Sequence, residues 1–253
     1  MPRRPREPSI LHSFFSRPFI LHCVQPLAIF LLEAVSAMSD FLTVLPEWQP
    51  VLAQAGLADL SSLLSFADGE CLSRHLRGKT SRWQLPGGQT IFIKQDFYSK
   101  FASIMQQLYM GSCPQPNTER ERRALALVAS YGITVPTVIA WGQRRRLGFP
   151  YQGVMVMLPL PGKSLLEYLP VEQDAQKRAA VIATAEKTLS FLQDNQLDWN
   201  KDCKPEHFFL LENGQIGLLD VERLRRRSRP LSAALRAFQL QRFRSLLPKT
   251  LHV

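Results

Sequence analysis

Two short apolar runs, Phe208 to Leu211 and Ile216 to Leu219, constrain the fold more than any other feature of the chain. They are separated by a short polar segment that contains the dipeptide Asn213-Gly214. Short β-forming runs joined in this way are typical of a β-hairpin, because Asn and Gly tolerate the backbone conformations of a tight turn. A hairpin brings the residues before its first strand close to those after its second. We therefore expect the polar residues on its two sides to meet.

Those flanking residues suit phosphoryl transfer. The chemistry needs a carboxylate that orients and deprotonates a hydroxyl, and hard ligands that hold Mg²⁺ against nucleotide phosphates. Protein kinases supply them with an H-R-D-x-x-x-x-N loop and the metal-binding Asp of D-F-G. Here Asn200-Lys201-Asp202, His207 and Asp220-Val221-Glu222 stand at the corresponding positions. The alternative is a solvated loop with incidental carboxylates, and the ordered set around a hairpin favours the kinase-type site.

Composition sets the broad class of the protein. The chain has 253 residues, enough for one large or two small domains, and a formal net charge of +10. Such a charge suits nucleic acid, nucleotide phosphates or an anionic membrane surface. No nucleic-acid partner is expected, because no helix-turn-helix, zinc or RNA-binding signature is present. The four cysteines form no C-x-x-C pair, so reduced cytoplasmic thiols are expected.

The first 37 residues are expected to lie outside the fold. A basic start, a broken apolar stretch at 19–32 and the small residues Val35-Ser36-Ala37 imitate a secretory signal. Export would separate the chain from ATP, which conflicts with a kinase-type site. We interpret Met38 as the natural start and residues 1–37 as a non-native or disordered extension.

A second hairpin is predicted around Pro86-Gly87-Gly88, and its second strand, Thr90 to Lys94, is rich in β-branched and aromatic residues. In a kinase-like lobe a strand lysine neutralises the nucleotide's α- and β-phosphates, and a helix glutamate holds it. Lys94 is the candidate for this role. A strand-end lysine that reaches solvent is the alternative.

A helix that could carry the glutamate is predicted from Thr118 to Tyr131. Glu121, Leu125 and Val128 share one of its faces, so Glu121 needs a partner, for which we favour Lys94. The alternative is a capping box in which Glu121 serves the helix terminus opposite Thr118. Glu119 is the second choice as partner of Lys94.

The remaining chain divides into predicted regions. Residues 38–68 are expected to form N-terminal helices, 69–160 a sheet-rich lobe, and 161–253 a helical lobe. The basic amphipathic stretch Ser232 to Leu247 is interpreted either as a final core helix or as a contact with anionic lipid. Arg144-Arg145-Arg146 reads as a solvated turn, with contact to an anionic substrate or membrane as the alternative.

Residues 70–227 resemble the lipopolysaccharide kinase family, whose members phosphorylate heptose or Kdo sugars of the lipid A–core. The family's catalytic segment runs H-[RK]-D-x-x-x-x-H, then a hairpin, then I-D-hydrophobic-[EH]-[KR]. The stretches Asn200 to Phe208 and Leu219 to Arg223 are similar to it. Glu121 to Leu125 and Gly132-Ile133 are similar to the family's glutamate helix and its exit.

The resemblance implies an α+β, protein-kinase-like fold of two lobes, with a small sheet-rich N-lobe and a reduced helical C-lobe. It implies an ATP-dependent kinase acting on a core sugar or a lipid A–core precursor, in the cytoplasm or peripherally on the cytoplasmic face of the inner membrane. The expected cofactors are ATP and Mg²⁺, with Mn²⁺ as an alternative. The site residues expected are, for catalysis, Asp202 and Lys204; for the metal, Asp220 and His207; and for the nucleotide, Lys94, Glu121, Gly78 and Ser81.

Three departures keep a second hypothesis open. One is His207 itself, because a histidine is a softer ligand than an asparagine oxygen and suits Mn²⁺ better than Mg²⁺. Asn200 replaces the usual His, and no G-x-G-x-x-G is present, so the phosphate-covering role is assigned to the segment that begins at Gly78. A catalytically weak kinase-like protein with a stress-response or scaffolding role is therefore the alternative function.

Overall fold

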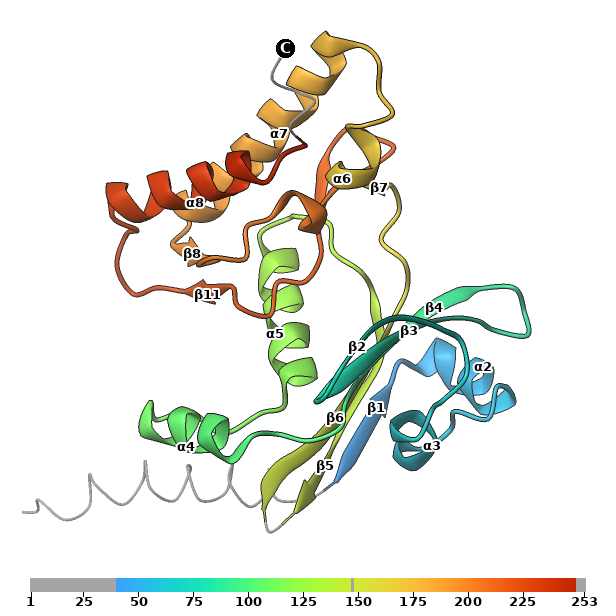
Figure 1. The fold of residues 1–253 in the computed structure, drawn as a ribbon. Helices are drawn as coiled ribbons and strands as arrows, with labels where there is room; N and C mark the ends of the chain where they lie inside the picture. Colours follow the sequence, from blue (N-terminus) through green and yellow to red (C-terminus); the bar gives the residue numbers. More distant parts are fainter. Residues whose placement is uncertain (1–39, 147, 249–253) are drawn as a thin grey trace, which may run out of the picture. The chain divides into compact units, whose positions relative to one another are not determined.

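A six-stranded antiparallel sheet organises the first half of the chain (Figure 1). The computed structural model describes residues 40–146 and 148–248, so the extension predicted at 1–37 lies outside the described residues. In spatial order the strands are β1 (Phe41–Val44), β5 (Val138–Arg146), β6 (Phe149–Met157), β4 (Thr90–Asp96), β3 (Gly78–Gln84) and β2 (Glu70–His75). The predicted hairpin is β3–β4, and β4 continues two residues beyond Lys94.

The sheet separates two hydrophobic cores, because side chains alternate between the faces of a strand. Ile91 and Ile93 of β4 join the core under the N-terminal helices, and Gln95 on that face donates to three backbone carbonyls of that region. The covering elements are η1 (Pro46–Trp48), α2 (Gln49–Gln54) and α3 (Leu60–Leu64). Helices were expected throughout this region, but Phe41–Val44 is a strand, because it pairs with β5.

The other face of the sheet packs against α5 (Asn117–Ser130), which α4 (Phe101–Tyr109) precedes in the chain. Helix α5 closely matches the predicted helix, and Gly132 follows it with a φ of +79°. Asp96, at the end of β4, accepts a hydrogen bond of 2.7 Å from the backbone N–H of Thr118. A β4 carboxylate therefore satisfies the first turn of α5, which fixes the helix against the strand that carries Lys94.

The second half of the described chain is mostly helical, with two small sheets, one of three strands and one of two. Its elements are β7 (Lys163–Ser164), α6 (Leu165–Tyr168), α7 (Ala175–Asp194), β8 (Leu197–Asp198), η2 (Pro205–His207), β9 (Phe208–Leu210), β10 (Ile216–Leu218), β11 (Arg225–Arg226) and α8 (Ala233–Ser245). Strands β9 and β10 pair antiparallel and form the hairpin that the two apolar runs predict. Strand β7 extends that hairpin, and β8 pairs with β11. The lobe boundaries at 68 and 160 stay predictions.

Helix α8 belongs to the core of this half. Phe243 is fully buried, and its ring meets that of Phe208 edge-on at 4.9 Å. Arg236 and Arg244 form ion pairs with Asp194 and Glu186 of α7. These contacts favour the core-helix interpretation of this stretch over a free lipid-binding helix. Within the described ranges, no helix combines the length and the apolar character needed to cross a bilayer.

Candidate active site

Lys94, Glu121 and Asp220 meet between the two halves of the described chain. The Lys94 ammonium forms an ion pair with the Glu121 carboxylate, and its Nζ lies 3.6 Å from Asp220 Oδ1. The three residues come from β4, from α5 and from the loop after β10. Glu121 does not cap its helix, because Asp96 satisfies the Thr118 N–H and Glu121 is buried against Lys94. The favoured pairing is thus present, and Glu119 instead pairs with Arg122 and Arg123.

Burial and charge act in opposite directions on the Lys94–Glu121 pair. Burial disfavours the charged form of Lys94, but Glu121 and Asp220 outweigh it and hold the pKa of Lys94 above its ordinary value. Burial raises the pKa of the Glu121 carboxyl to about 7, although the Lys94 charge opposes this shift. Lys94 therefore stays cationic at neutral pH, which its expected role in binding phosphate requires.

Asp220 is presented by an unusual backbone conformation. Its φ of +53° lies in the left-handed region, which non-glycine residues rarely adopt and which often marks functional positions. The next residue, Val221, is fully buried and anchors the turn, while the Asp220 side chain is 44% exposed. The carboxylate is thus held at the site and still open to a ligand.

His207 is oriented toward Asp220 by a hydrogen bond on its other ring nitrogen. Its Nδ1 lies 2.8 Å from the carbonyl oxygen of Asp202, so Nδ1 is the protonated nitrogen when the ring is neutral. Its Nε2 then presents a lone pair 3.6 Å from Asp220 Oδ2. The Leu219 N–H also donates to the His207 carbonyl. The hairpin therefore brings the two predicted metal ligands, Asp220 and His207, close together. The hydrogen bond at Nδ1 of His207 fixes the ring, as in metal-binding histidines, and Nε2 is the nitrogen that could bind a metal.

Asp202 and Lys204 lie in the loop that leads to His207. Asp202 Oδ2 is 3.0 Å from Arg223 Nε, an ion pair across the mouth of the hairpin. Lys204 Nζ lies 3.1 Å from Glu206 Oε1, so Lys204 is paired within its own loop. The loop and the residues after the hairpin thus converge as the two apolar runs predict.

The structure does not bring Ser81 to this site. Ser81 is the cross-strand neighbour of Ile93, and its side chain is fully buried on the opposite sheet face from Lys94. Thr80, the cross-strand neighbour of Lys94, shares the Lys94 face instead. Gly78 lies opposite Asp96 at the start of β3, where an added Cβ would come 2.6 Å from the Gln95 carbonyl oxygen. The assignment of Ser81 to the phosphates is therefore corrected, because one step along a strand reverses the face.

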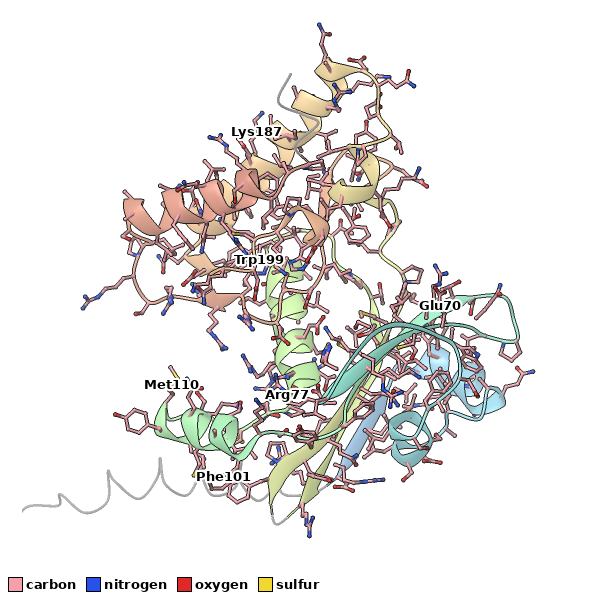
Figure 2. The ribbon with its side chains drawn as sticks, viewed as in Figure 1. Glu70, Arg77, Phe101, Met110, Lys187 and Trp199 are labelled. Atoms are coloured by element: carbon pink, nitrogen blue, oxygen red, sulfur yellow. The ribbon has the colours of Figure 1, made fainter. Side chains whose placement is uncertain are left out.

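Asp198 is a structural residue of the site that sequence reasoning missed. It is 3% exposed and accepts hydrogen bonds from the Asn200 backbone N–H at 2.8 Å and from Gln239 Nε2 at 2.6 Å. Arg227 donates to it through Nε at 2.9 Å and Nη2 at 2.6 Å. The only local signal was a carboxylate between two large apolar residues, Leu197 and Trp199, of which Trp199 is labelled in Figure 2. Asp198 therefore secures the loop in which Asn200 replaces the family's His.

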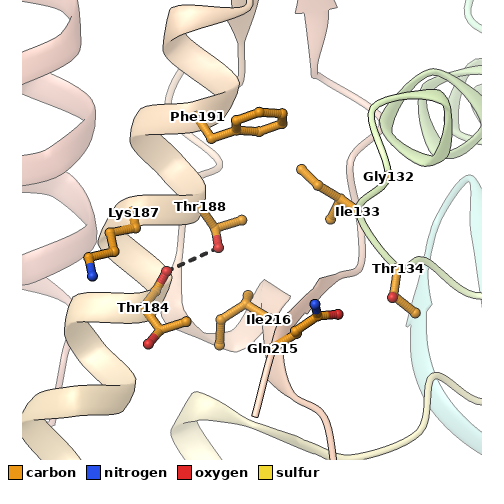
Figure 3. Close-up of a pocket in the computed structure, with 9 residues that line it drawn as sticks. All are labelled: Gly132, Ile133, Thr134, Thr184, Lys187, Thr188, Phe191, Gln215 and Ile216. Carbon is orange, nitrogen blue, oxygen red and sulfur yellow. Dashed lines mark hydrogen bonds between the residues drawn. The ribbon is translucent and has the colours of Figure 1, made fainter. Parts of the chain in front are cut away.

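A separate pocket of about 280 Å³ lies behind the hairpin (Figure 3). It is formed by α7, by the loop after α5 and by the start of β10, and Figure 3 shows the Thr188 hydroxyl bonded to the Thr184 carbonyl within it. None of its lining residues is one of the site residues above. It is therefore distinct from the site around Lys94.

Comparison with known proteins identifies the family. The model described as "Lipopolysaccharide kinase (Kdo/WaaP) family" matches residues 92–247, more than half of the chain. The chain belongs to this family. The match includes Lys94, Glu121, Asp202, His207 and Asp220, whereas Gly78 and Ser81 precede it.

A solved structure supports the fold of this lipopolysaccharide kinase family member. The structure titled "WaaP in complex with acyl carrier protein" aligns with a TM-score of 0.57 and 16% sequence identity, over 81% of this chain and 80% of that chain. The expected α+β, kinase-like fold is confirmed, with its antiparallel six-stranded sheet. No curated protein matches the chain.

Proposed function

We propose that this lipopolysaccharide kinase family member transfers the γ-phosphoryl group of ATP to a hydroxyl of a heptose or Kdo sugar of the lipopolysaccharide core. The acceptor would be the core itself or a lipid A–core precursor, reached from the cytoplasm, where ATP is available. One observation carries the proposal: Lys94 lies between Glu121 and Asp220, next to the loop that holds Asp202. This arrangement supports the proposed roles of Lys94 as the phosphate-binding cation, Asp220 as the metal-binding carboxylate and Asp202 as the base.

The nucleotide and its metal would be held by residues of both halves. Lys94 would bind the α- and β-phosphates, with Glu121 fixing its direction. Asp220 and His207 would hold Mg²⁺, or Mn²⁺, for which a ring nitrogen is the better ligand. Among the described residues, no group of three or more His, Cys, Asp or Glu side chains could enclose an ion alone. Two protein ligands are enough, because Mg²⁺ keeps several waters and takes the rest of its ligands from the phosphates. The ion supplies charge neutralisation at the phosphates when bound.

The acceptor hydroxyl would meet Asp202. Asp202 orients the hydroxyl and takes its proton, while the new bond forms between the acceptor oxygen and the γ-phosphorus. The bond from that phosphorus to the β–γ bridging oxygen breaks, and its electron pair leaves with ADP. Arg223 already holds one carboxylate oxygen of Asp202, which leaves the other for the hydroxyl. Lys204 would add positive charge near the transferred group. Catalysis would consist mainly of positioning and electrostatic stabilisation.

The proposal is tested at Asp202. The Asp202→Asn variant keeps the shape of the side chain but removes its basicity, so phosphate transfer should fall by about 100-fold or more with folding intact. Transfer is measured by mass spectrometry of purified lipid A–core after incubation with ATP, and folding by thermal unfolding. Asp194→Asn, at an exposed carboxylate paired with Arg236, is the matched control and should keep full transfer. Near-normal turnover by Asp202→Asn would contradict the role of Asp202 as the base.

The ion pair between Asp202 and Arg223 supports a second candidate, a catalytically weak kinase-like protein with a stress-response or scaffolding role. Two features would slow transfer: Arg223 engages one oxygen of the Asp202 carboxylate, and Asn200 replaces the family's His. Titration of ATP with Mg²⁺ or Mn²⁺ separates the two candidates when Tm and turnover are both followed, since bound ligand raises Tm. A rise in Tm without phosphate transfer would favour the weak kinase.

A further inference from the structure

Helix α4 exposes a concentrated apolar surface. Phe101 is 73% exposed, Tyr109 is 94% exposed and Met110 is 72% exposed, whereas Ile104 is buried and fixes the helix to the protein. Figure 2 shows Phe101 and Met110 at the two ends of α4. Met105 and Leu108 add to the same surface, with more than a third of each side chain exposed. Five large apolar side chains within ten residues are a patch of the kind that marks an interaction site.

No acidic side chain lies along this part of the chain. Between Asp96 and Glu119 the sequence contains no carboxylate, and its one charged residue is Lys100. The polar side chains of α4 are neutral serine and glutamine residues. The surface can therefore approach a negatively charged partner without repulsion from a carboxylate in the helix or its flanks.

The apolar surface continues onto the tip of the β5–β6 hairpin, which is basic. The Ser99 N–H donates to the Tyr151 carbonyl at 2.9 Å, and the Arg145 guanidinium lies beside the Cys113 thiol. The flanks of α4 therefore contact both strands of the hairpin. Phe149 and Tyr151 of β6 are 42% and 39% exposed.

The arginines expected in a solvated turn instead end strand β5, which runs to Arg146. Arg144 is paired with Asp40, and Arg145 donates to the Gly148 carbonyl, so Arg146 is the exposed arginine at this tip. Lys100, also exposed, precedes α4.

We propose that α4 and the β5–β6 tip form the surface by which this protein contacts an anionic phospholipid membrane. Aromatic and Met side chains would enter the boundary between headgroups and acyl chains, and the exposed Arg146 and Lys100 would attract anionic headgroups. Helix α8 offers less of such a surface, because Phe243 is packed in the core, Phe238 is its one large apolar side chain that is more than a third exposed, and two of its arginines are paired with α7.

A second copy of the chain fits this surface less well than a membrane. A symmetric dimer brings the same patch of both subunits together, so it would bring the Arg146 and Lys100 side chains of both subunits close to each other. A membrane also explains why the patch is both apolar and basic. The inference extends the proposed function, because an acceptor carried on lipid A lies at a membrane surface.

The test uses the full chain and sedimented vesicles without nucleotide. Vesicles of phosphatidylethanolamine with phosphatidylglycerol are compared with vesicles of phosphatidylcholine alone. The variant Phe101→Ser/Tyr109→Ser/Met110→Ser should lower partitioning to the anionic vesicles by about tenfold or more, since one well-buried side chain of this size gives that effect. Arg146→Gln should lower it by about fivefold, and high salt should remove that difference.

Control variants carry the same type of change at apolar residues that are exposed elsewhere. Val171→Ser and Phe238→Ser, at residues that are 66% and 42% exposed, should bind as the wild type does. If the triple variant does not fold, Tyr109→Ser and Arg146→Gln alone carry the test, because both side chains are exposed.

Three outcomes would overturn the inference. They are unchanged partitioning of the α4 variants, equal binding to neutral vesicles, or a wild-type dimer that the triple variant dissociates. No phosphate transfer is measured, so failure here is distinct from failure of the Asp202→Asn test.

Discussion

Protonation of Glu121 should set the lower pH limit for nucleotide binding at the site. Burial raises the pKa of its carboxyl to about 7, and only the ionised form attracts Lys94. As pH falls through 7, Glu121 takes up a proton, Lys94 loses its partner, and phosphate binding weakens. We therefore expect kcat/KM for ATP to fall below pH 7, approaching a tenfold loss per pH unit, as expected for one required ionisation.

The matched variant for this prediction is Glu121→Gln, whose amide does not titrate. Its activity should be lower at pH 8 and nearly independent of pH between 6 and 8. An unchanged acid limb in Glu121→Gln would assign the ionisation to another group. The assay is the pH profile of ATP consumption in the presence of lipid A–core.

Asp198 should matter for stability and for turnover together. Asp198→Ala leaves Arg227 and Gln239 without their acceptor. Water can solvate Arg227, whose side chain is 57% exposed, so the loss comes mainly from the buried Gln239 amide and should be about 1–3 kcal/mol. Because the same carboxylate secures the Asn200 backbone, kcat should fall while KM for ATP stays near the wild-type value.

Denaturant unfolding and steady-state kinetics measure these two effects of Asp198→Ala. Asp198→Asn, which keeps the shape, should recover part of both. Asp194→Ala, at an exposed ion pair, is the control and should change stability by about 1 kcal/mol or less. Equal losses in the Asp198 and Asp194 variants would count against the role of Asp198.

The site residues differ in how far the sequence could reveal them. Asp202, His207 and Asp220 were predictable, because one short hairpin joins them and their spacing is local. Asp198 was not, because its partners Arg227 and Gln239 lie far along the chain and only the fold brings them together.

At the scale of elements, local pattern predicted the β9–β10 and β3–β4 hairpins and helix α5. It did not predict β1, because Phe41–Val44 becomes a strand only by pairing with β5, about 100 residues later. It also misplaced Ser81, because the face on which a strand residue lies depends on a register that the turn does not reveal. Long-range pairing is therefore the part of the fold that the sequence conceals.

The contact between β6 and the start of α5 should be intolerant of added volume. A Cβ at Gly153 would overlap Thr118 Oγ1 and lie 2.8 Å from Pro116 side-chain atoms. Gly153→Ala should therefore push α5 away from the sheet and lower stability by about 1–3 kcal/mol. The same displacement would move Glu121 from Lys94, so nucleotide affinity should fall as well.

Thermal unfolding and ATP titration measure the two effects of Gly153→Ala. Gly87→Ala is the control, because nothing lies within 4 Å of its added Cβ and its φ is not positive. A Gly153→Ala variant as stable as the control would show that α5 can shift without cost.

At the scale of the whole molecule, the arginines that contribute to the net charge of +10 have different roles. Arg227, Arg236 and Arg244 are structural, because each is paired with a carboxylate. At the β5–β6 tip, Arg144 is likewise paired, with Asp40, whereas Arg146 is exposed at the edge of the α4 surface, where we place the membrane contact. Composition alone suggested an anionic partner, and only the structure separates arginines that stabilise the fold from arginines available to a partner.

The segment between Asp220 and helix α8 bears on how the activity of the protein could be regulated. Only residues 221–232 connect Asp220 to α8. They are held in place midway, where β11 pairs with β8 and Arg227 donates a hydrogen bond to Asp198. Many protein kinases are turned on when a long loop at this place is phosphorylated and reordered. This segment is too short and too firmly fastened to swing between two positions. We therefore expect that activity is not switched by phosphorylation and reordering of residues 221–232.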